Sequence, residues 1–255
     1  MMSRLRRALS TMSSAARQRP QPLFRHLDTF LSLPDTSVDH RFDRPFCKTY
    51  DYAGEFIDQP HQSFITCLKR DRMIDIGIDG WLLPDDAMKL YEMAYFSNDN
   101  ILELGTYRGL GTSIIASAAN AAGSVGKVIS VDIDPEHIDR AESSLQGRPG
   151  WKQTRLIVSD ANAAIADFAG KSETFSFAFV DHSHRYEHMV LTCRRLHYIV
   201  SPGGFALFHD FNDPRNSDPH NDDYGVYQAV THGLDQQCWE FWGIYGCAAL
   251  YRRTW

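Results

Sequence analysis

The 255-residue chain lacks the features that mark several large protein classes. No apolar run approaches the length of a membrane span, so we expect a soluble protein without a membrane partner. The five cysteines are odd in number and show no CxxC spacing, which argues against a disulfide framework or a zinc site and favours buried thiols in a reducing compartment. A net charge of -6 gives no reason to expect nucleic-acid binding. These absences favour a cytoplasmic location.

Positive charge is scarce overall but concentrated at the beginning of the chain. Six arginines and no acidic residue precede Asp28. The Arg-rich, Ser-rich stretch "MMSRLRRALSTMSSAARQRP" is typical of an organelle transit peptide, which would make the location mitochondrial. A solvated arm that packs on a neighbouring subunit explains the same composition, and this is the interpretation we favour.

Strand and helix patterns alternate regularly from Asn100 onward. Strands are predicted at residues 101–105, 127–132, 154–160, 175–181 and 204–210, and two further strands, 239–246 and 247–254, follow with almost no connection. Thr112 or Ser113 is the expected N-cap of one helix, and Asp134 with Pro135 opens another. A later helix is expected to end at "SPGG". This alternation of strands and helices predicts an α/β, Rossmann-like fold: a seven-stranded, mostly parallel sheet with a C-terminal antiparallel hairpin and helices on both faces.

The first of these strands ends in a glycine-rich turn, "LELGTYRGLGTS". Gly105, Gly109 and Gly111 have the G-x-x-x-G-x-G spacing that dinucleotide oxidoreductases also use, so an NAD(P)-dependent oxidoreductase is one alternative. Against it, about 100 residues precede the turn, and no tyrosine has the catalytic lysine four positions later. Glu103 lies inside the strand, where a carboxylate would repel a pyrophosphate but suit a cationic ligand.

Acidic residues also end the next two strands. Asp132 follows the last glycine by about 20 residues, at the position where an acid binds ribose hydroxyls. Asp160 ends the third strand, where it could accept a hydrogen bond from an adenine amino group. Acids at three successive strands favour S-adenosylmethionine, which carries an ammonium and a sulfonium, over a dinucleotide.

Several motifs resemble known enzymes. "LELGTYRG" is similar to the first motif of class I S-adenosylmethionine-dependent methyltransferases, in its catechol O-methyltransferase version, while "VISVDIDPEHI" and "VSDANAAI" resemble the second and adenine-side motifs. "FVDHSHRYEH" and "SPGGFALFHDF" resemble small-molecule O-methyltransferases and family-24 methyltransferases. The resemblance covers roughly residues 74–255 and implies a seven-stranded sheet with a reversed last strand. The expected cofactor contacts are Glu103, Gly105, Tyr107, Gly109, Gly111, Thr112, Ser113, Asp132, Ile133, Asp160, Ala161, Asp181 and His182.

The methyl acceptor is expected to bind beside the cofactor, near Asp181 and Asp210. These two residues end neighbouring strands. Such a carboxylate pair suits Mg²⁺ or another divalent cation, with His209 as a third candidate ligand. The catechol enzymes have an asparagine directly after the second acid, where this chain has Phe211. They place a lysine base at the position of His184, and a histidine there can remove a hydroxyl proton near neutral pH. Asp181 and His184 are therefore the predicted catalytic residues.

The sequence thus predicts an S-adenosylmethionine-dependent methyltransferase, acting on a hydroxyl of a small-molecule acceptor with or without a divalent metal. The alternatives are the oxidoreductase and a non-catalytic relative that only binds the cofactor. Residues 1–70 are predicted to form an extension that covers the acceptor pocket or an interface of a homo-oligomer, and residues 71–255 the catalytic domain. The polar loop 211–225 is expected to be either an acceptor-binding lid or a plain surface loop.

Overall fold

The computed structural model describes residues 22–25, 36–39, 44–47 and 73–254. The Arg-rich stretch, interpreted as a subunit-packing arm or alternatively as a transit peptide, lies outside the described residues, as does most of the predicted extension. Within the described parts of that extension, β1 (Thr36–Asp39) and β2 (Arg44–Cys47) pair as an antiparallel ribbon. Among the described residues, no helix is long and apolar enough to cross a membrane.

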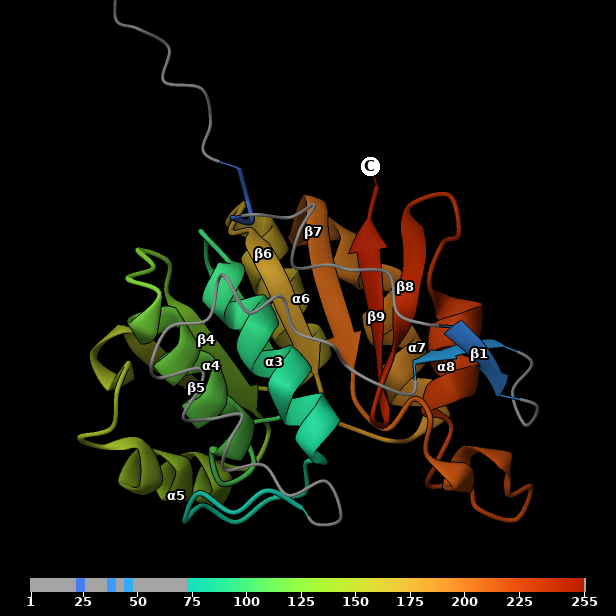
Figure 1. Ribbon diagram of the computed structural model, residues 1–255, viewed down its shortest axis with the longest axis horizontal. Coiled ribbons are helices and arrows are strands. Elements are labelled where there is room, and N and C mark those ends of the chain that lie inside the picture. Colours follow the sequence, from blue (N-terminus) through green and yellow to red (C-terminus); the bar gives the residue numbers. More distant parts are fainter. Residues whose placement is uncertain (1–21, 26–35, 40–43, 48–72, 255) are drawn as a thin grey trace, which may run out of the picture.

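After the helix α3, strands and helices alternate from residue 101 onward, as expected from Asn100 (Figure 1). The helices and short 3-10 turns are α3 (Pro84–Phe96), α4 (Leu110–Ala121), α5 (Pro135–Leu145), η2 (Trp151–Gln153), α6 (Ala161–Gly170), α7 (Tyr186–Arg195), η3 (Leu196–Tyr198), η4 (Pro214–Ser217) and α8 (Val226–Gly233). The strands are β3 (Ile101–Leu104), β4 (Val128–Asp132), β5 (Thr154–Val158), β6 (Phe175–Val180), β7 (Val200–Phe208), β8 (Trp239–Tyr245) and β9 (Ala248–Arg253).

The main sheet has seven strands in the order β5-β4-β3-β6-β7-β9-β8. All neighbouring pairs from β5 to β7 are parallel, and β9 runs antiparallel to both β7 and β8. The predicted fold class and the terminal hairpin are therefore confirmed. The chain leaves β3 toward β4 on one side and returns to β6 on the other, so a crevice opens beyond the carboxyl ends of β3 and β6.

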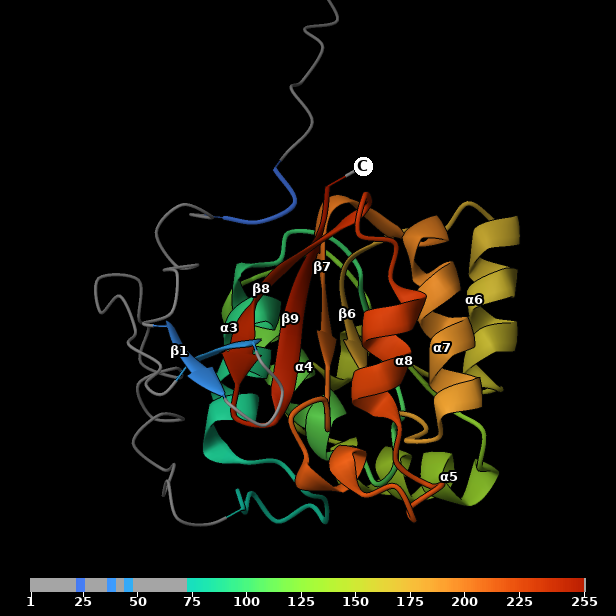
Figure 2. The same cartoon turned by 90° about the vertical axis from the view of Figure 1, so that its right-hand side faces the viewer.

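Two apolar layers cover the faces of the sheet (Figure 2). Because successive residues of a strand point to opposite faces, Ile101 packs toward α3 and α4, while Leu102 packs toward α6, α7 and α8. Burial on both faces explains why the inner strands are continuous apolar runs in the sequence. Glu103 points to the same face as Ile101, under the beginning of α4.

Helix ends follow the predicted capping residues in part. Asp134 caps α5 by accepting the Glu136 N–H at 2.8 Å, with Pro135 at the first position, as expected. The predicted N-cap at Thr112 or Ser113 is wrong. The N-cap of α4 is Gly109, with φ of +90°, and the helix begins at Leu110.

The predicted end of the later helix is also wrong. "SPGG" lies inside β7, and the helix that precedes it, α7, ends at Arg195 and is followed by the short turn η3.

Candidate functional site

A cavity of about 930 Å³ lies beyond the carboxyl ends of β3, β4, β6 and β7. The segment before α3, the loop after β7 and the turn between β8 and β9 complete its wall. The lining residues that the sequence also singled out are Glu103, Gly105, Tyr107, Gly111, Asp132, Ile133, Asp181, His182, His184, His209 and Asp210. The fold therefore brings most of the predicted site residues to one concave surface at the switch point of the sheet.

The turn between β3 and α4 places its backbone very close to the end of β6. A Cβ on Gly105, whose φ is +103°, would lie 2.0 Å from the carbonyl oxygen of Asp181, so a larger residue cannot replace it without movement. The Tyr107 N–H donates to Asp132 Oδ2 at 2.8 Å, which ties the turn to the end of β4. Gly109 faces Ala141 of α5 instead of the cavity. Gly105 thus lets the turn pack directly against the end of β6, and it lines the cavity there.

Glu103 is a buried carboxylic acid at the floor of this cavity, only 1% exposed. Its Oε2 accepts hydrogen bonds from the hydroxyls of Thr112 and of Ser130, the latter at 2.5 Å. A Cβ on Gly111 would lie 2.3 Å from Glu103 Oε1, so Gly111 lets α4 cover the acid closely. Burial raises the pKa of Glu103 to about 8, against the lowering effect of the two hydroxyls. A cation in the cavity would favour its ionised form.

The rim of the cavity near β4 is acidic at one point and apolar around it. Asp132 Oδ1 accepts the Asp134 N–H at 3.0 Å and lies 3.2 Å from His137 Nδ1. Ile133 beside it is 70% exposed. The Tyr107 ring stacks on Trp81 with centroids 5.5 Å apart. An acid next to flat apolar surfaces suits a ribose and an adenine base.

Other predicted cofactor contacts lie away from the cavity wall. Asp160 is exposed and caps α6, since its Oδ1 accepts the Ala163 N–H at 2.9 Å. Thr112 and Ser113 are buried in the first turn of α4, and Ala161 is buried at the start of α6. Contacts from these residues to a cofactor stay predictions.

His182, by contrast, lines the cavity, and its Nε2 lies 2.9 Å from Thr192 Oγ1. Burial lowers the pKa of His182 to about 4, so the ring is neutral at physiological pH.

The acceptor side contains a tight group of carboxylates and imidazoles. His209 Nδ1 lies 3.2 Å from both Asp181 Oδ1 and Asp210 Oδ2. His184 Nε2 lies 2.9 Å from Asp210 Oδ2, and its ring stacks on Tyr224 with centroids 4.5 Å apart. Asp181, His184 and Asp210 each offer a ligand atom within 4.8 Å of the others. The predicted metal set of Asp181, His209 and Asp210 is thus brought together, with His184 as an additional neighbour.

Charge pairing sets the protonation of this group. Burial alone would raise the pKa of Asp210, but hydrogen bonds from His184 and His209 hold it well below its usual range. Burial alone would lower the pKa of His209, but the charge of Asp181 and its hydrogen bonds with the acids raise it well above its usual range. His209 therefore bridges the two carboxylates as a cation.

The loop after β7 contributes a cation to the cavity in addition to its acids. Arg215 lies over the Tyr224 ring at 3.9 Å and pairs with Asp213 at 2.7 Å. Arg215, Asp213 and Tyr224 all line the cavity. The loop expected to be either a lid or a surface loop therefore forms part of the cavity wall.

Several lining residues were not singled out by the sequence analysis. They are Trp81, Asp86, His137, Arg215, Tyr224 and Cys247. Asp86 follows Pro84 in a stretch that indicates only a helix start, and Trp81 lies in a segment without a periodic pattern. Since these residues come from segments far apart in the sequence, no local signal marks them as members of one site.

Comparison with known proteins agrees with this geometry. Residues 102–211 match the model of a family described as "Methyltransferase domain". Among solved structures, cofactor-bound Rv0187 from MTB has a TM-score of 0.57 at 16% identity, covering 77% of this chain and 90% of that one. The O-methyltransferase from Bacillus cereus in complex with SAH has a TM-score of 0.54 at 15% identity, covering 78% and 92%. TomG, an O-methyltransferase from Streptomyces achromogenes, has a TM-score of 0.51 at 16% identity, covering 78% and 91%. No curated protein matches the chain.

The sheet order and the cavity at its switch point define a class I methyltransferase fold. Together with the family match, they identify residues 102–211 as an S-adenosylmethionine-dependent methyltransferase domain.

Proposed function

We propose that this enzyme transfers the methyl group of S-adenosylmethionine to a hydroxyl oxygen of a small-molecule acceptor. One observation carries the proposal: the His184–Asp210 pair, 2.9 Å apart, lines the same cavity as the glycine turn. A proton acceptor therefore lies beside the expected methyl donor. Solved structures with the same fold include the O-methyltransferases from Bacillus cereus and Streptomyces achromogenes, which supports oxygen as the acceptor atom.

The residues around the turn fit the cofactor. Gly105 lets the turn approach the end of β6 at the cavity wall. Asp132 and Ile133 offer an acid and an exposed apolar surface, and Glu103 places a carboxyl group beneath. S-adenosylmethionine supplies the electrophilic methyl group when bound. The protein holds donor and acceptor in line and excludes water, which alone can supply a large part of the rate acceleration.

The acceptor hydroxyl must lose its proton for this reaction. His184 is 38% exposed at the cavity, so its ring can reach both solvent and a bound acceptor. Asp210, held ionised by its two histidine partners, stabilises the positive charge that His184 acquires with the proton. This arrangement performs the deprotonation without a metal ion.

A divalent cation on Asp181, His184 and Asp210 is the second version of the proposal, because their ligand atoms lie within 4.8 Å of one another. The set fits Mg²⁺ poorly. Mg²⁺ demands six ligands, nearly all oxygen, whereas here an imidazole takes part, Phe211 follows Asp210, and His209 Nδ1 contacts both carboxylates. We therefore favour the metal-free version and expect activity to survive chelation.

Transfer of labelled methyl groups to a panel of catechols, sugars and hydroxy acids tests the proposal. The variant His184→Gln should lower kcat by roughly 10²–10⁴-fold and leave S-adenosylhomocysteine affinity unchanged. His188→Gln is the matched control, since His188 is exposed on α7 and lies outside the cavity wall. Equal activity of both variants would refute the role of His184. Loss of activity with EDTA that Mg²⁺ but not Zn²⁺ restores would favour the cation at Asp181, His184 and Asp210.

Two results would overturn the proposal itself. Stabilisation by NADP(H) but not by S-adenosylhomocysteine would indicate the oxidoreductase. Cofactor binding without turnover of any acceptor would indicate the non-catalytic relative.

The remaining parts of the proposal concern location and assembly. We propose a cytoplasmic enzyme with a small-molecule acceptor and no nucleic-acid or membrane partner, whose N-terminal extension covers the acceptor pocket or joins subunits of a homo-oligomer. Light scattering on the full chain and on a chain starting at residue 71 tests the second role. If both proteins have the same number of subunits, the extension does not join subunits.

A further inference from the structure

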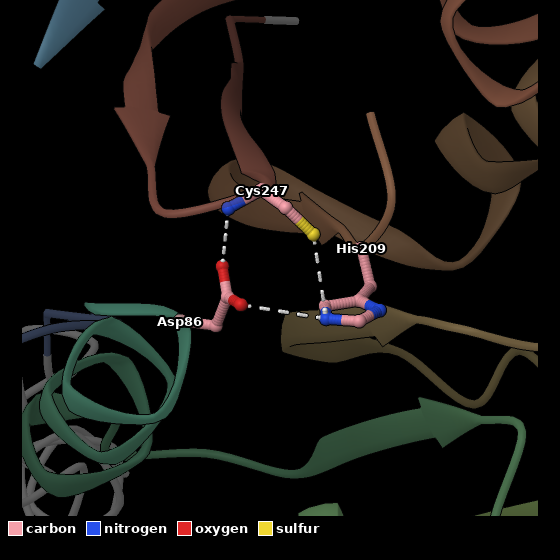
Figure 3. A group of neighbouring side chains, drawn as sticks. All are labelled: Asp86, His209 and Cys247. Carbon is pink, nitrogen blue, oxygen red and sulfur yellow. Dashed lines mark hydrogen bonds and ion pairs between the residues drawn. The ribbon is translucent and has the colours of Figure 1, made fainter. Parts of the chain in front are cut away.

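Three side chains from distant segments converge on the wall of the cavity (Figure 3). Asp86 belongs to the first turn of α3, His209 follows β7, and Cys247 lies in the turn between β8 and β9. His209 Nε2 lies 3.5 Å from Asp86 Oδ2 and 3.7 Å from Cys247 Sγ. The three potential ligand atoms all lie within 4.8 Å of one another, and Asp86 and His209 are buried.

Backbone contacts fix the positions of two of these residues. Asp86 Oδ1 accepts the N–H groups of Cys247 at 2.7 Å and of Ala248 at 3.1 Å, while Oδ2 accepts the Leu83 N–H at 3.0 Å. A Cβ on Gly246 would lie 2.5 Å from Asp86 Oδ1, so a glycine is needed for this close approach. Anchoring the turn explains the carboxylate. It does not explain why a thiol and an imidazole nitrogen point to the same place.

The other nitrogen of His209 is held by carboxylates, since Nδ1 lies 3.2 Å from Asp181 Oδ1 and from Asp210 Oδ2. Histidines that bind metals commonly donate one ring N–H to a carboxylate, which fixes the ring and directs the other nitrogen to the ion. Nε2 of His209 faces Asp86 and Cys247 in this way.

We propose that Asp86, His209 and Cys247 bind a zinc ion. Zinc bound tetrahedrally at its usual distances to sulfur, nitrogen and oxygen separates its ligand atoms by roughly 3.4–3.6 Å. The separations of 3.5 and 3.7 Å around Nε2 match that geometry before any ion is added. The thiol and imidazole select zinc over Mg²⁺ or Ca²⁺. Three protein ligands leave a fourth position for water or a small molecule from the cavity.

The sequence argues against a zinc site because it has no CxxC motif, but that argument applies only to ligands that are close together in the chain. The ligands come from positions 86, 209 and 247, so their proximity depends on the fold and not on spacing along the chain. The proposal assigns a role to Cys247 that differs from the buried, inert thiol expected from the sequence.

Metal binding by the full-length protein tests the proposal without any methyl-transfer assay. After dialysis against a chelator, titration with Zn²⁺ in competition with a chromophoric chelator should give about one tightly bound ion per chain. Replacement by Co²⁺ should produce a sulfur-to-cobalt charge-transfer band. Cys247→Ser should lose the band. It should also weaken zinc binding by at least roughly 10–100-fold, the loss seen when a residue that only hydrogen-bonds to a metal ligand is replaced.

Cys238→Ser is the matched control, since Cys238 is a free, partly exposed cysteine with Asp235 Oδ2 at 3.6 Å from its sulfur. This variant should keep both the band and the affinity. Absence of stoichiometric zinc or of the cobalt band in the unmodified chain, which needs no variant to fold, would overturn the proposal. So would tight binding that Cys247→Ser leaves unchanged, because the ion would then lie elsewhere, such as at Asp181, His184 and Asp210. Neither result bears on methyl transfer.

Discussion

Replacing Glu103 with glutamine should make the cofactor-free protein more stable at alkaline pH. Burial raises the pKa of Glu103 to about 8, from 4.5 for an unperturbed glutamate. The folded state therefore binds this proton more tightly than the unfolded state. The stability gained from this tighter proton binding is fully present below pH 4.5, declines as the pH rises, and is lost above pH 8. Glutamine is neutral and has nearly the same shape, so it should escape this loss.

The pKa difference sets the size of the effect. A change of one in pKa corresponds to about 1.4 kcal/mol, so the shift to about 8 amounts to about 5 kcal/mol at the alkaline limit. Because Glu103 is only 1% exposed, solvent screening reduces this figure little. Between pH 5 and pH 8, the wild-type protein should lose about 3.5 kcal/mol that the glutamine variant retains.

Urea unfolding at pH 5 and pH 8 measures this difference directly. The comparison is between wild type, Glu103→Gln and Glu142→Gln, an exposed glutamate on α5 that should behave like wild type. Other titrating groups affect all three proteins alike and cancel. If wild type and Glu103→Gln lose the same free energy over this range, Glu103 is ionised in the folded state and the reasoning about the floor of the cavity fails.

Two further substitutions test the glycine turn and a helix cap. Gly105→Ala should abolish cofactor binding and destabilise the fold by more than the roughly 1–2 kcal/mol of backbone strain, because its Cβ would meet the Asp181 carbonyl oxygen at 2.0 Å. Gly147→Ala, with φ of +81° and open space around it, should cost only the strain, and equal thermal shifts would contradict the close approach. Asp134→Ala should cost about 1 kcal/mol in urea unfolding through loss of the α5 cap, and Asp139→Ala on the exposed face should cost much less.

The sequence was sufficient for the fold because the sheet is parallel and covered on both faces. Its inner strands are therefore largely apolar, such as the β6 sequence "FSFAFV", in which every residue, including Ser176, is buried. Strand order is not recorded in such runs, and only the structure shows it. The start of α4 was misplaced because Gly109, in a left-handed conformation, replaces the side-chain cap that the rule expects.

The candidate site could be predicted only where strand ends supply it. Asp132, Asp181 and Asp210 follow parallel strands, and parallel strands end at one edge of a sheet, so their proximity follows from the topology. Asp86 and Cys247 reach the same cavity from a helix start and a hairpin turn. Nothing in local sequence couples these two positions, and only the packed structure shows that Asp86 holds the turn carrying Cys247.

His209 joins the two halves of this cavity. Three carboxylates, Asp86, Asp181 and Asp210, lie within 3.5 Å of its two ring nitrogens. Asp86 and Asp210 are buried and Asp181 is partly buried, and a positive charge among them offsets the cost of removing carboxylates from water. The imidazole supplies one such cation when doubly protonated. A zinc ion on Nε2 would replace that proton with a larger charge at the same place, so the carboxylate cluster is compatible with either occupant.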